Sequence, residues 1–249
     1  MVKAITFDFW QTIYIDNQEL NVKRDELRAF KTWKYLVEIG HNNLRLEDVE
    51  RSVEAANNFG LSLWYEGFVI TIDDCIAEMG KVLGIKFNGV ETHSITEIMG
   101  LATLETAPPL APFVETQLPE LAKEYRLGIV SDTGLTSAKF LRCLLSRDDI
   151  ISYFLALGFS DEMGYSKPNP IIFHLTLQQL GVASSESVHI GDLIQTDICG
   201  AKRAGMRTIQ YTNGSQKQYT NEFKTDIQNL AADAVIDNFC NIKLVIADW

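Results

Sequence analysis

Side chains that can bind a metal ion and an anion follow several apolar runs of this chain. Asp8 comes directly after the first run, and Ser131 and Asp132 end the run RLGIVSD. Asp192 ends SVHIGD, and Lys167 lies in GYSKPNP. Carboxylates are hard oxygen ligands of the kind that Mg²⁺ prefers, while hydroxyl and ammonium groups can neutralise the oxygens of an anion. These residue types suit a site that holds a divalent cation beside a charged substrate.

The elements that must position these side chains are short apolar runs separated by stretches of helical length. The runs cover residues 3–9, 126–132, 153–160, 187–192, 207–212 and 233–237, and amphipathic stretches cover 111–124, 135–145, 170–180 and 195–204. This alternation predicts a Rossmann-like α/β fold, a parallel sheet with helices on both faces. Because the carboxyl ends of parallel strands share one edge, we expect the polar residues there, including Ser160, Asp161 and Glu162, to converge.

Residues 17–103 interrupt the alternation with helical patterns only. Three stretches, residues 26–40, 46–60 and 70–84, each end in glycine, which is typical of a helix C-terminus. The proline-rich segment 107–112 then returns the chain to the α/β pattern. We therefore predict a core domain of residues 1–16 and 104–249 and an inserted all-helical domain of residues 17–103, lying over the carboxyl edge of the sheet.

Composition argues against several classes of function. The chain has 249 residues, a formal net charge of −11 and an isoelectric point near 4.8, so we expect neither nucleic acid nor a membrane as partner. Cys75, Cys143, Cys199 and Cys240 form no metal-binding pattern, and we expect reduced thiols in packed helices. We expect no signal peptide, because an apolar strand begins within the first few residues, and no apolar run reaches spanning length. We expect a soluble cytoplasmic protein.

The order of these motifs resembles that of the haloacid dehalogenase-like (HAD) hydrolase superfamily. FDFWQT resembles the first motif, with Asp8 in the nucleophile position, and IVSDT resembles the second, with Ser131. SKPNP matches the third through Lys167, and GDLIQTD matches the fourth through Asp192 and Asp197. The resemblance implies an HAD-like core, a helical cap over the active site, a hydrolase activity and Mg²⁺ as cofactor.

The residue types agree with a phosphatase that acts on a small phosphorylated molecule. An aspartate carboxylate can attack phosphorus and form an aspartyl-phosphate, so Asp8 is the expected nucleophile. Ser131 and Lys167 are expected to hold the phosphoryl oxygens as catalytic and substrate-binding groups. We also expect Thr12 and Asp132 to contact the substrate.

The magnesium site is expected at the carboxylates of Asp8 and Asp192. The resemblance adds the backbone carbonyl of Trp10 as a metal ligand. Asp197 is expected to lie behind these ligands and to orient Lys167 or a metal-bound water. Oligomeric state and the physiological substrate are not predicted by the sequence.

Trp10 is a departure from the family's pattern. HAD phosphatases usually carry a second aspartate there, two residues after the nucleophile, as general acid and base. An indole can act neither as general acid nor as general base, and general acid–base catalysis is typically worth about 10²–10⁴-fold in rate. One hypothesis is a phosphatase that takes its proton transfer from elsewhere, with Asp16, Asp132, Asp73 and Asp74 as candidates, or that acts on good leaving groups.

Two alternatives remain open at this point. A 2-haloacid dehalogenase resembles this chain in its aromatic residue after the nucleophile, and it would need a cap cation such as Arg24 or Arg28 for the substrate carboxylate. A binding protein without activity is the second alternative. The aromatic residues Trp33, Trp64 and Tyr65 of the insertion favour packing in a core over lining a pocket.

Overall fold

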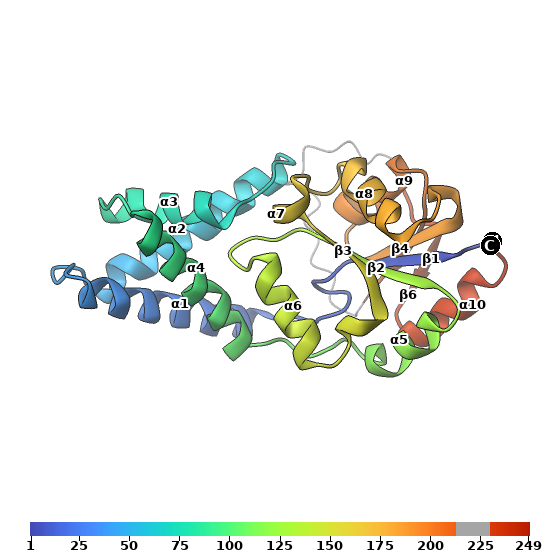
Figure 1. The fold of residues 1–249 in the computed structure, drawn as a ribbon, viewed down its shortest axis with the longest axis horizontal. Helices are drawn as coiled ribbons and strands as arrows, with labels where there is room; N and C mark the ends of the chain where they lie inside the picture. Colours follow the sequence, from blue (N-terminus) through green and yellow to red (C-terminus); the bar gives the residue numbers. More distant parts are fainter. Residues whose placement is uncertain (213–229) are drawn as a thin grey trace.

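The computed structural model describes residues 1–212 and 230–249 and shows a parallel sheet with a helical body at one end (Figure 1). Within those residues the sheet has six strands in the order β3-β2-β1-β4-β5-β6, and all neighbouring strands are parallel. Their bounds are β1 Ala4–Phe7, β2 Arg126–Ser131, β3 Phe154–Phe159, β4 Ser187–Gly191, β5 Arg207–Tyr211 and β6 Ala234–Ile236. Each predicted apolar run contains one strand, so the Rossmann-like sheet is confirmed.

Helices cover both faces of this sheet, which is why every residue of its central strands β1 and β4 is buried. They are α5 Val114–Ala122, α6 Ala138–Arg147, α7 Ser160–Met163, α8 Pro170–Leu180, α9 Cys199–Arg203 and α10 Ile242–Ile246, with a π-helical turn at Ile194–Ile198. Ile5 and Phe7 of β1 belong to the core cluster that includes residues of α5, α6 and α10. Ala4 belongs to the opposite cluster, with residues of α8 and α9. Side chains therefore alternate between two buried faces, as a parallel sheet requires.

The insertion forms a helical body with a core of its own. Its helices are α1 Gln18–Glu38, α2 Leu46–Tyr65, α3 Ile72–Leu83 and α4 Gly89–Glu105. Asn17 caps α1, accepting a hydrogen bond from the Leu20 N–H, and Asn88 caps α4 in a capping box with Glu91. Apolar residues from all four helices form one cluster, including Leu36, Val53, Met79 and Met99.

Two predicted ends in this body differ from the structure. The expected end of the second helix at Gly60 was wrong, because α2 continues to Tyr65. Gly60 is buried, and a Cβ there would contact Cys75 and Ile70, so this glycine serves helix packing rather than termination. The last helix continues to Glu105, past the predicted domain boundary at residue 103.

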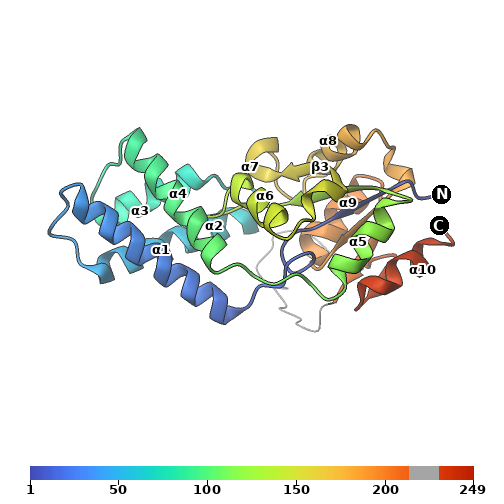
Figure 2. The same cartoon turned by 60° about the horizontal axis from the view of Figure 1, so that its bottom comes forward.

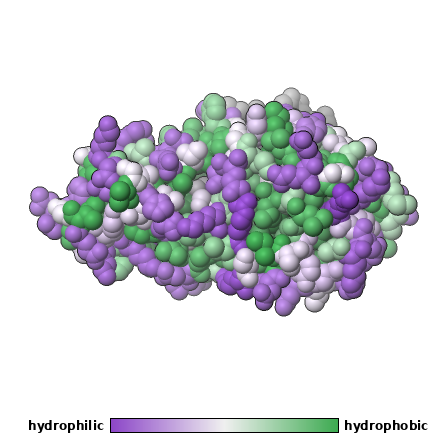
Figure 3. Space-filling model, in the orientation of Figure 1, coloured by the Kyte–Doolittle hydropathy of each residue, from purple (hydrophilic) through white to green (hydrophobic). Residues whose placement is uncertain are grey.

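The helical body and both chain termini lie at opposite ends of the molecule (Figures 1 and 2). Hydrophilic residues spread over both parts on the face shown in Figure 3. In the described part of the chain, no helix is long and apolar enough to cross a membrane. All four cysteines are free, but only Cys75 and Cys199 are buried. Cys143 and Cys240 are exposed, so the expectation that all four are packed was wrong.

Candidate active site

The loop after β1 brings Asp8 and Trp10 to the carboxyl edge of the sheet. The Asp8 N–H donates to the carbonyl of Ile190 on β4 at 2.8 Å, which extends the strand pairing by one residue. The N–H groups of Ile13 and Tyr14 both donate to the carbonyl of Phe9, at 3.0 and 2.9 Å. The chain turns here through Gln11, whose φ of 58° lies in the left-handed region. This tight loop keeps Asp8 beside the sheet and directs the chain into α1.

Lys167 lies between two carboxylates. Its Nζ is 2.7 Å from Asp8 Oδ1 and 2.6 Å from Asp197 Oδ1. Asn169 caps α8 from the same loop, accepting from the Ile171 N–H, and Pro170 occupies the first turn. The side chain of Lys167 is only 4% exposed, so it is buried among acids rather than solvated at a helix start.

The Asp197 carboxylate contacts three donors, one of which is Lys167. Its Oδ2 accepts from the Leu193 N–H at 3.0 Å, and its Oδ1 lies 3.3 Å from His189 Nε2. Because a carboxylate only accepts, Nε2 carries the proton, and Nδ1 of a neutral ring accepts from Thr6 Oγ1 at 2.9 Å. Burial lowers the pKa of His189, in agreement with a neutral ring. A Cβ at Gly191 would be 2.4 Å from Asp197 Cγ, so glycine leaves room for this arrangement.

Charge is divided unequally among the buried acids. Burial raises the pKa of Asp8 to about 7, against the lowering effect of Lys167. Burial favours the neutral form of Asp197 too, but Lys167 and His189 outweigh it and hold the pKa of Asp197 below its ordinary value. Burial alone would lower the pKa of Lys167, whereas Asp197 and Asp8 raise it. Lys167 is therefore protonated, and Asp197 is the carboxylate that stays ionised beside it.

Asp192 completes an acidic cluster with an excess of negative charge. Carboxylate oxygens of Asp8, Asp192 and Asp197 lie within 4.8 Å of one another. Burial, Asp197 and Asp8 raise the pKa of Asp192 well above its ordinary value. No described residue donates a side-chain hydrogen bond or ion pair to the Asp192 carboxylate. The possible ligands are hard oxygens, and three carboxylates share a single ammonium group, which fits Mg²⁺.

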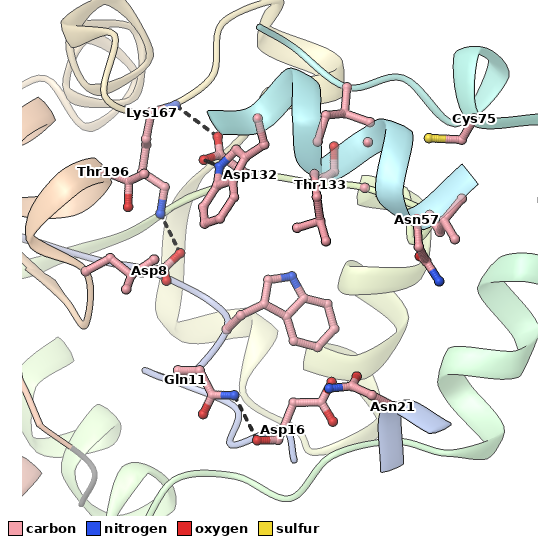
Figure 4. Close-up of a pocket in the computed structure, with 18 of the residues that line it drawn as sticks. Asp8, Gln11, Asp16, Asn21, Asn57, Cys75, Asp132, Thr133, Lys167 and Thr196 are labelled. Atoms are coloured by element: carbon pink, nitrogen blue, oxygen red, sulfur yellow. Dashed lines mark hydrogen bonds and ion pairs between the residues drawn. The ribbon is translucent and has the colours of Figure 1, made fainter. Parts of the chain in front are cut away.

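A cavity of about 310 Å³ opens in front of this cluster and lies between the sheet edge and the helical body (Figure 4). From the core side it is lined by Asp8, Trp10, Gln11, Asp16, Asp132, Thr133, Gly134, Leu135, Lys167, Asp192, Leu193 and Thr196. From the helical body it is lined by Asn21, Ala56, Asn57, Gly60, Leu61, Trp64, Ile70 and Cys75. Lys167 is the only cationic side chain among the described residues that line it.

Asp132 connects the two sides of this cavity. Its Oδ1 accepts from the Lys167 N–H at 2.9 Å and from Ser166 Oγ at 3.0 Å. Its Oδ2 accepts from Trp64 Nε1 of α2 at 2.9 Å. Burial raises the pKa of Asp132 despite these donors and Lys167. A residue of the core loop is thus bonded to the helical body across the cavity.

Several predicted site residues do not line the cavity. Thr12 and Ser131 are fully buried; the Thr12 hydroxyl has no hydrogen-bond partner among the described residues, and Ser131 Oγ donates to the carbonyl of Asp132 at 3.2 Å. Asp73 and Asp74 are exposed at the start of α3. Of the four candidate acids, only Asp16 and Asp132 reach the cavity.

The expected convergence of all polar strand ends was wrong for β3. Ser160 Oγ accepts from the Thr133 N–H at 2.9 Å, and Asp161 Oδ2 accepts from the Ala138 N–H at the start of α6 at 3.0 Å. Glu162 pairs with Arg142. These three residues stabilise the loop and helix beside the site, because β3 is the edge strand and its end lies away from the cluster.

Arg24 and Arg28 are buried in the junction between the helical body and the core. Arg24 makes a bidentate ion pair with Asp16, at 2.6 and 3.2 Å, and also donates to Thr106. Arg28 donates to Thr136 Oγ1 at 3.0 Å and to Asp25. Neither arginine lines the cavity, so both hold the junction instead of a substrate.

Three kinds of residue at this site were not predicted from the sequence pattern. His189 fixes Asp197, yet it lay inside a predicted strand, ahead of the fourth motif, and was given no role. Trp64 packs against the core of the helical body as expected, but it also lines the cavity and donates to Asp132. Asn21 and Asn57 line the cavity from helices whose polar residues could not be told from surface residues in the sequence.

Comparison with known proteins agrees with this architecture. A family profile described as HAD-hydrolase-like matches residues 164–242. The glyceraldehyde 3-phosphate phosphatase of Methanopyrus kandleri is 33% identical over 236 residues, covering 94% of each chain. The protein of the same name from Methanocaldococcus jannaschii is 25% identical over 245 residues, 98% of this chain and 99% of that one.

Solved structures share the fold over the whole chain. A 2-haloacid dehalogenase from Pseudomonas syringae superposes with a TM-score of 0.70 at 22% identity and covers 100% of both chains. An HAD phosphatase from Thermococcus onnurineus gives a TM-score of 0.66 at 20% identity and covers 98% of both chains. At these identities the structures show the fold, whereas the similarity of the curated relatives extends to the sequence.

Proposed function

The chain belongs to the haloacid dehalogenase-like hydrolase family, and within it we propose a magnesium-dependent phosphatase that uses Asp8 as nucleophile on a small phosphorylated molecule. The relative from Methanopyrus kandleri, a named phosphatase, supports a phosphatase through its 33% identity over nearly the full length. The same similarity favours an enzyme over the alternative of a binding protein without activity.

One observation carries the proposal. Lys167 Nζ lies within 2.7 Å of both Asp8 and Asp197, at the floor of a cavity that Asp192 also lines. An ammonium group fixed beside the nucleophile can neutralise the oxygens of a transferring phosphoryl group, and phosphoryl transfer needs mainly such positioning and charge neutralisation.

Magnesium fits the residues present. The carboxylates of Asp8 and Asp192 would hold it, with the backbone carbonyl of Trp10 as a further ligand. Bound there, the cation would balance the excess negative charge of the cluster and polarise the phosphoryl oxygens. Asp197, committed to Lys167, His189 and the Leu193 N–H, would keep the lysine in place.

The reaction divides into two steps at Asp8. The ionised Asp8 carboxylate attacks phosphorus, a P–O(Asp8) bond forms, and the bond to the leaving oxygen breaks with its electron pair going to that oxygen. Water then attacks the acyl-phosphate, releases phosphate and regenerates the carboxylate. The leaving oxygen needs a proton unless it is a weak base. Trp10 cannot give one, and Asp16 and Asp132 are the two candidate proton donors that line the cavity.

The dehalogenase alternative is disfavoured by the charges around the cavity. A 2-haloacid carries a carboxylate that needs a cation, and both arginines considered for that role are buried in the junction. Asp192 and Asp197 would add negative charge beside the substrate, which a metal-free dehalogenation does not require.

The proposal is tested by assaying p-nitrophenyl phosphate hydrolysis with and without Mg²⁺, together with chloride release from 2-chloropropionate. We expect magnesium-dependent release of p-nitrophenol, abolished in Asp8→Asn. Chloride release without metal would instead identify a dehalogenase. Absence of both activities, with no beryllofluoride adduct at Asp8, would reject the hydrolytic site assigned to this residue.

A further inference from the structure

Two side-chain amides from the helical body face the cavity. Asn21 comes from the first turn of α1 and Asn57 from α2, and both line the space in front of Asp8 and Lys167. Figure 4 shows them on the side of the cavity away from Asp8 and Lys167. Any group attached to a phosphate bound at Lys167 would extend toward these two amides.

The orientation of each amide is fixed by a charged partner outside the cavity. Asn21 Oδ1 accepts from Arg24 Nη1 at 2.8 Å, and a guanidinium group can only donate. Asn57 Nδ2 donates to Asp25 Oδ2 at 2.9 Å, and a carboxylate can only accept. The Nδ2 group of Asn21 is therefore left as a hydrogen-bond donor, and the Oδ1 atom of Asn57 is left as an acceptor. Among the described residues neither of these two atoms has a hydrogen-bond partner.

The charges around the cavity exclude a second anionic group. Lys167 is the only cation among its described lining residues and is already shared by Asp8 and Asp197. The helical body contributes no charged side chain to the lining, and the remaining charged groups, Asp16, Asp132 and Asp192, are acids. A carboxylate or second phosphate would lose its hydration here and gain no counter-charge.

We propose that this half of the cavity selects phosphate monoesters whose alcohol part is short, uncharged and hydroxylated, such as a polyol or a hydroxyaldehyde. A hydroxyl group both accepts and donates, so it can accept from Asn21 Nδ2 and donate to Asn57 Oδ1. The cavity of about 310 Å³ lies at the small end of ligand sites, which favours a short chain. This inference rests on the proposed phosphatase function and adds the substrate class to it.

The first test uses pairs of substrates that differ in one charged group. Glycerol 3-phosphate is compared with 3-phosphoglycerate, and erythritol 4-phosphate with 4-phosphoerythronate, with p-nitrophenyl phosphate as reference. We expect kcat/KM to be more than about 10-fold higher for the neutral member of each pair, since an unpaired anion beside like charges is strongly disfavoured. Equal values within each pair, with the aryl phosphate hydrolysed, would overturn the inference and leave the phosphatase proposal intact.

The second test removes each amide. Asn21→Leu and Asn57→Leu are expected to lower kcat/KM for glycerol 3-phosphate by about 3- to 10-fold relative to each variant's own activity on p-nitrophenyl phosphate, as loss of one hydrogen bond predicts. Asn58→Leu, at the neighbouring exposed position, is the matched control and should leave this ratio unchanged. Because the readout is a ratio, partial unfolding affects both activities equally. A ratio that stays constant in both Asn variants would contradict the assigned contacts.

Substrate preference can also be measured as binding, in case no substrate turns over. Calorimetry with the Asp8→Asn variant, Mg²⁺ and the same pairs measures binding alone. Preferential binding of the polyol phosphates would support the inference although the proposed reaction had failed. Equal binding of neutral and carboxylated members, or preference for the latter, would overturn it.

Discussion

At the scale of single residues, we expect the side chain at position 10 to affect protonation of the leaving group but not the position of the Asp8 nucleophile. The loop after β1 keeps Asp8 beside Lys167 whatever the side chain at residue 10 is, because backbone hydrogen bonds define that loop. An aryl phosphate has a weakly basic leaving oxygen that departs unprotonated, whereas an alkyl phosphate does not.

Replacing Trp10 by Asp should therefore help only poor leaving groups. We expect kcat/KM for glycerol 3-phosphate to rise about 10- to 100-fold, at the lower end of general acid catalysis, with little gain for p-nitrophenyl phosphate. Trp10→Asn is the matched control, since it loses the same ring contact with Phe9 but adds no acid. If both variants change the two activities alike, the missing acid does not limit this enzyme.

The raised pKa values of Asp8 and Asp192 predict how the metal-free protein responds to pH. A carboxyl group with a raised pKa holds its proton more tightly in the folded than in the unfolded state. The free energy of unfolding therefore falls as pH rises from the ordinary pKa of 3.8 through the folded value, about 7 for Asp8. Melting temperatures of the metal-free protein should fall between pH 5 and 8, and Mg²⁺ should restore them at pH 8.

Asp192→Asn tests the same charge balance. The variant should melt higher than the wild type at pH 8 without metal, because it lacks one uncompensated, half-buried carboxylate beside two other acids, and it should gain little from Mg²⁺. Asp149→Asn removes an exposed carboxylate and controls for net charge. A wild-type and an Asp192→Asn protein with equal Mg²⁺-induced shifts would rule out Asp192 as a metal ligand.

Part of the site was predictable from the strand pattern alone. Asp8 and Asp192 meet because the carboxyl ends of β1 and β4 share an edge, whereas Lys167 and Asp197 lie in a loop and in the π-helical turn and were placed by the order of the motifs. His189 could not be placed, since its partner Thr6 is 183 residues away and a histidine in an apolar strand carries no signal of its contacts. The burial of Ser131 and Thr12 likewise depends on packing that the pattern does not encode.

At the scale of elements, a close contact fixes how the helical body meets the core. A Cβ at Gly100 of α4 would lie 2.0 Å from the ring of Phe140 on α6. Real side chains do not approach so closely, so α4 can pack on α6 in this way only with glycine there. The sequence pattern does not show what Gly60 and Gly100 face, which is why Gly60 was taken for a helix end.

Gly100→Ala should destabilise the protein although alanine favours helices. The added methyl group forces Phe140 or α4 to move, at a cost of about 1–3 kcal/mol for overpacking, against a gain of up to about 1 kcal/mol in helix propensity. We expect a net loss of about 1–2 kcal/mol in the free energy of unfolding, measured with urea. Gly89→Ala on the same helix meets no atom within 4 Å and should cause no loss; equal losses in both variants would exclude a specific contact at Gly100.

At the scale of the whole molecule, the cavity has one wall from the α/β core and one from the helical body, so its shape depends on the contact between these two parts. The helical body and the sheet each have their own apolar core. Between them run the Arg24–Asp16 ion pair, the Arg28–Thr136 hydrogen bond and the Trp64–Asp132 hydrogen bond. The first two hold the junction, whereas the third crosses the cavity to Asp132, whose other carboxylate oxygen accepts from the Lys167 N–H.

Trp64→Phe removes that third connection and keeps an aromatic ring in the cavity wall. We expect KM for small phosphate esters to rise about 3- to 10-fold, the size of one ordinary hydrogen bond, because the two walls are no longer held together. The free energy of unfolding should change little, since each body keeps its own core. Steady-state kinetics and urea unfolding measure the two quantities.

Trp33→Phe is the matched control for this prediction. Trp33 Nε1 donates to the carbonyl of Leu44 at 3.0 Å, so its bond lies wholly within the helical body. Its loss should affect stability rather than KM, the reverse of the pattern for Trp64. An equal rise of KM in both variants would mean that any loosening of the helical body weakens substrate binding, and that the Trp64–Asp132 bond has no special part in closing the cavity.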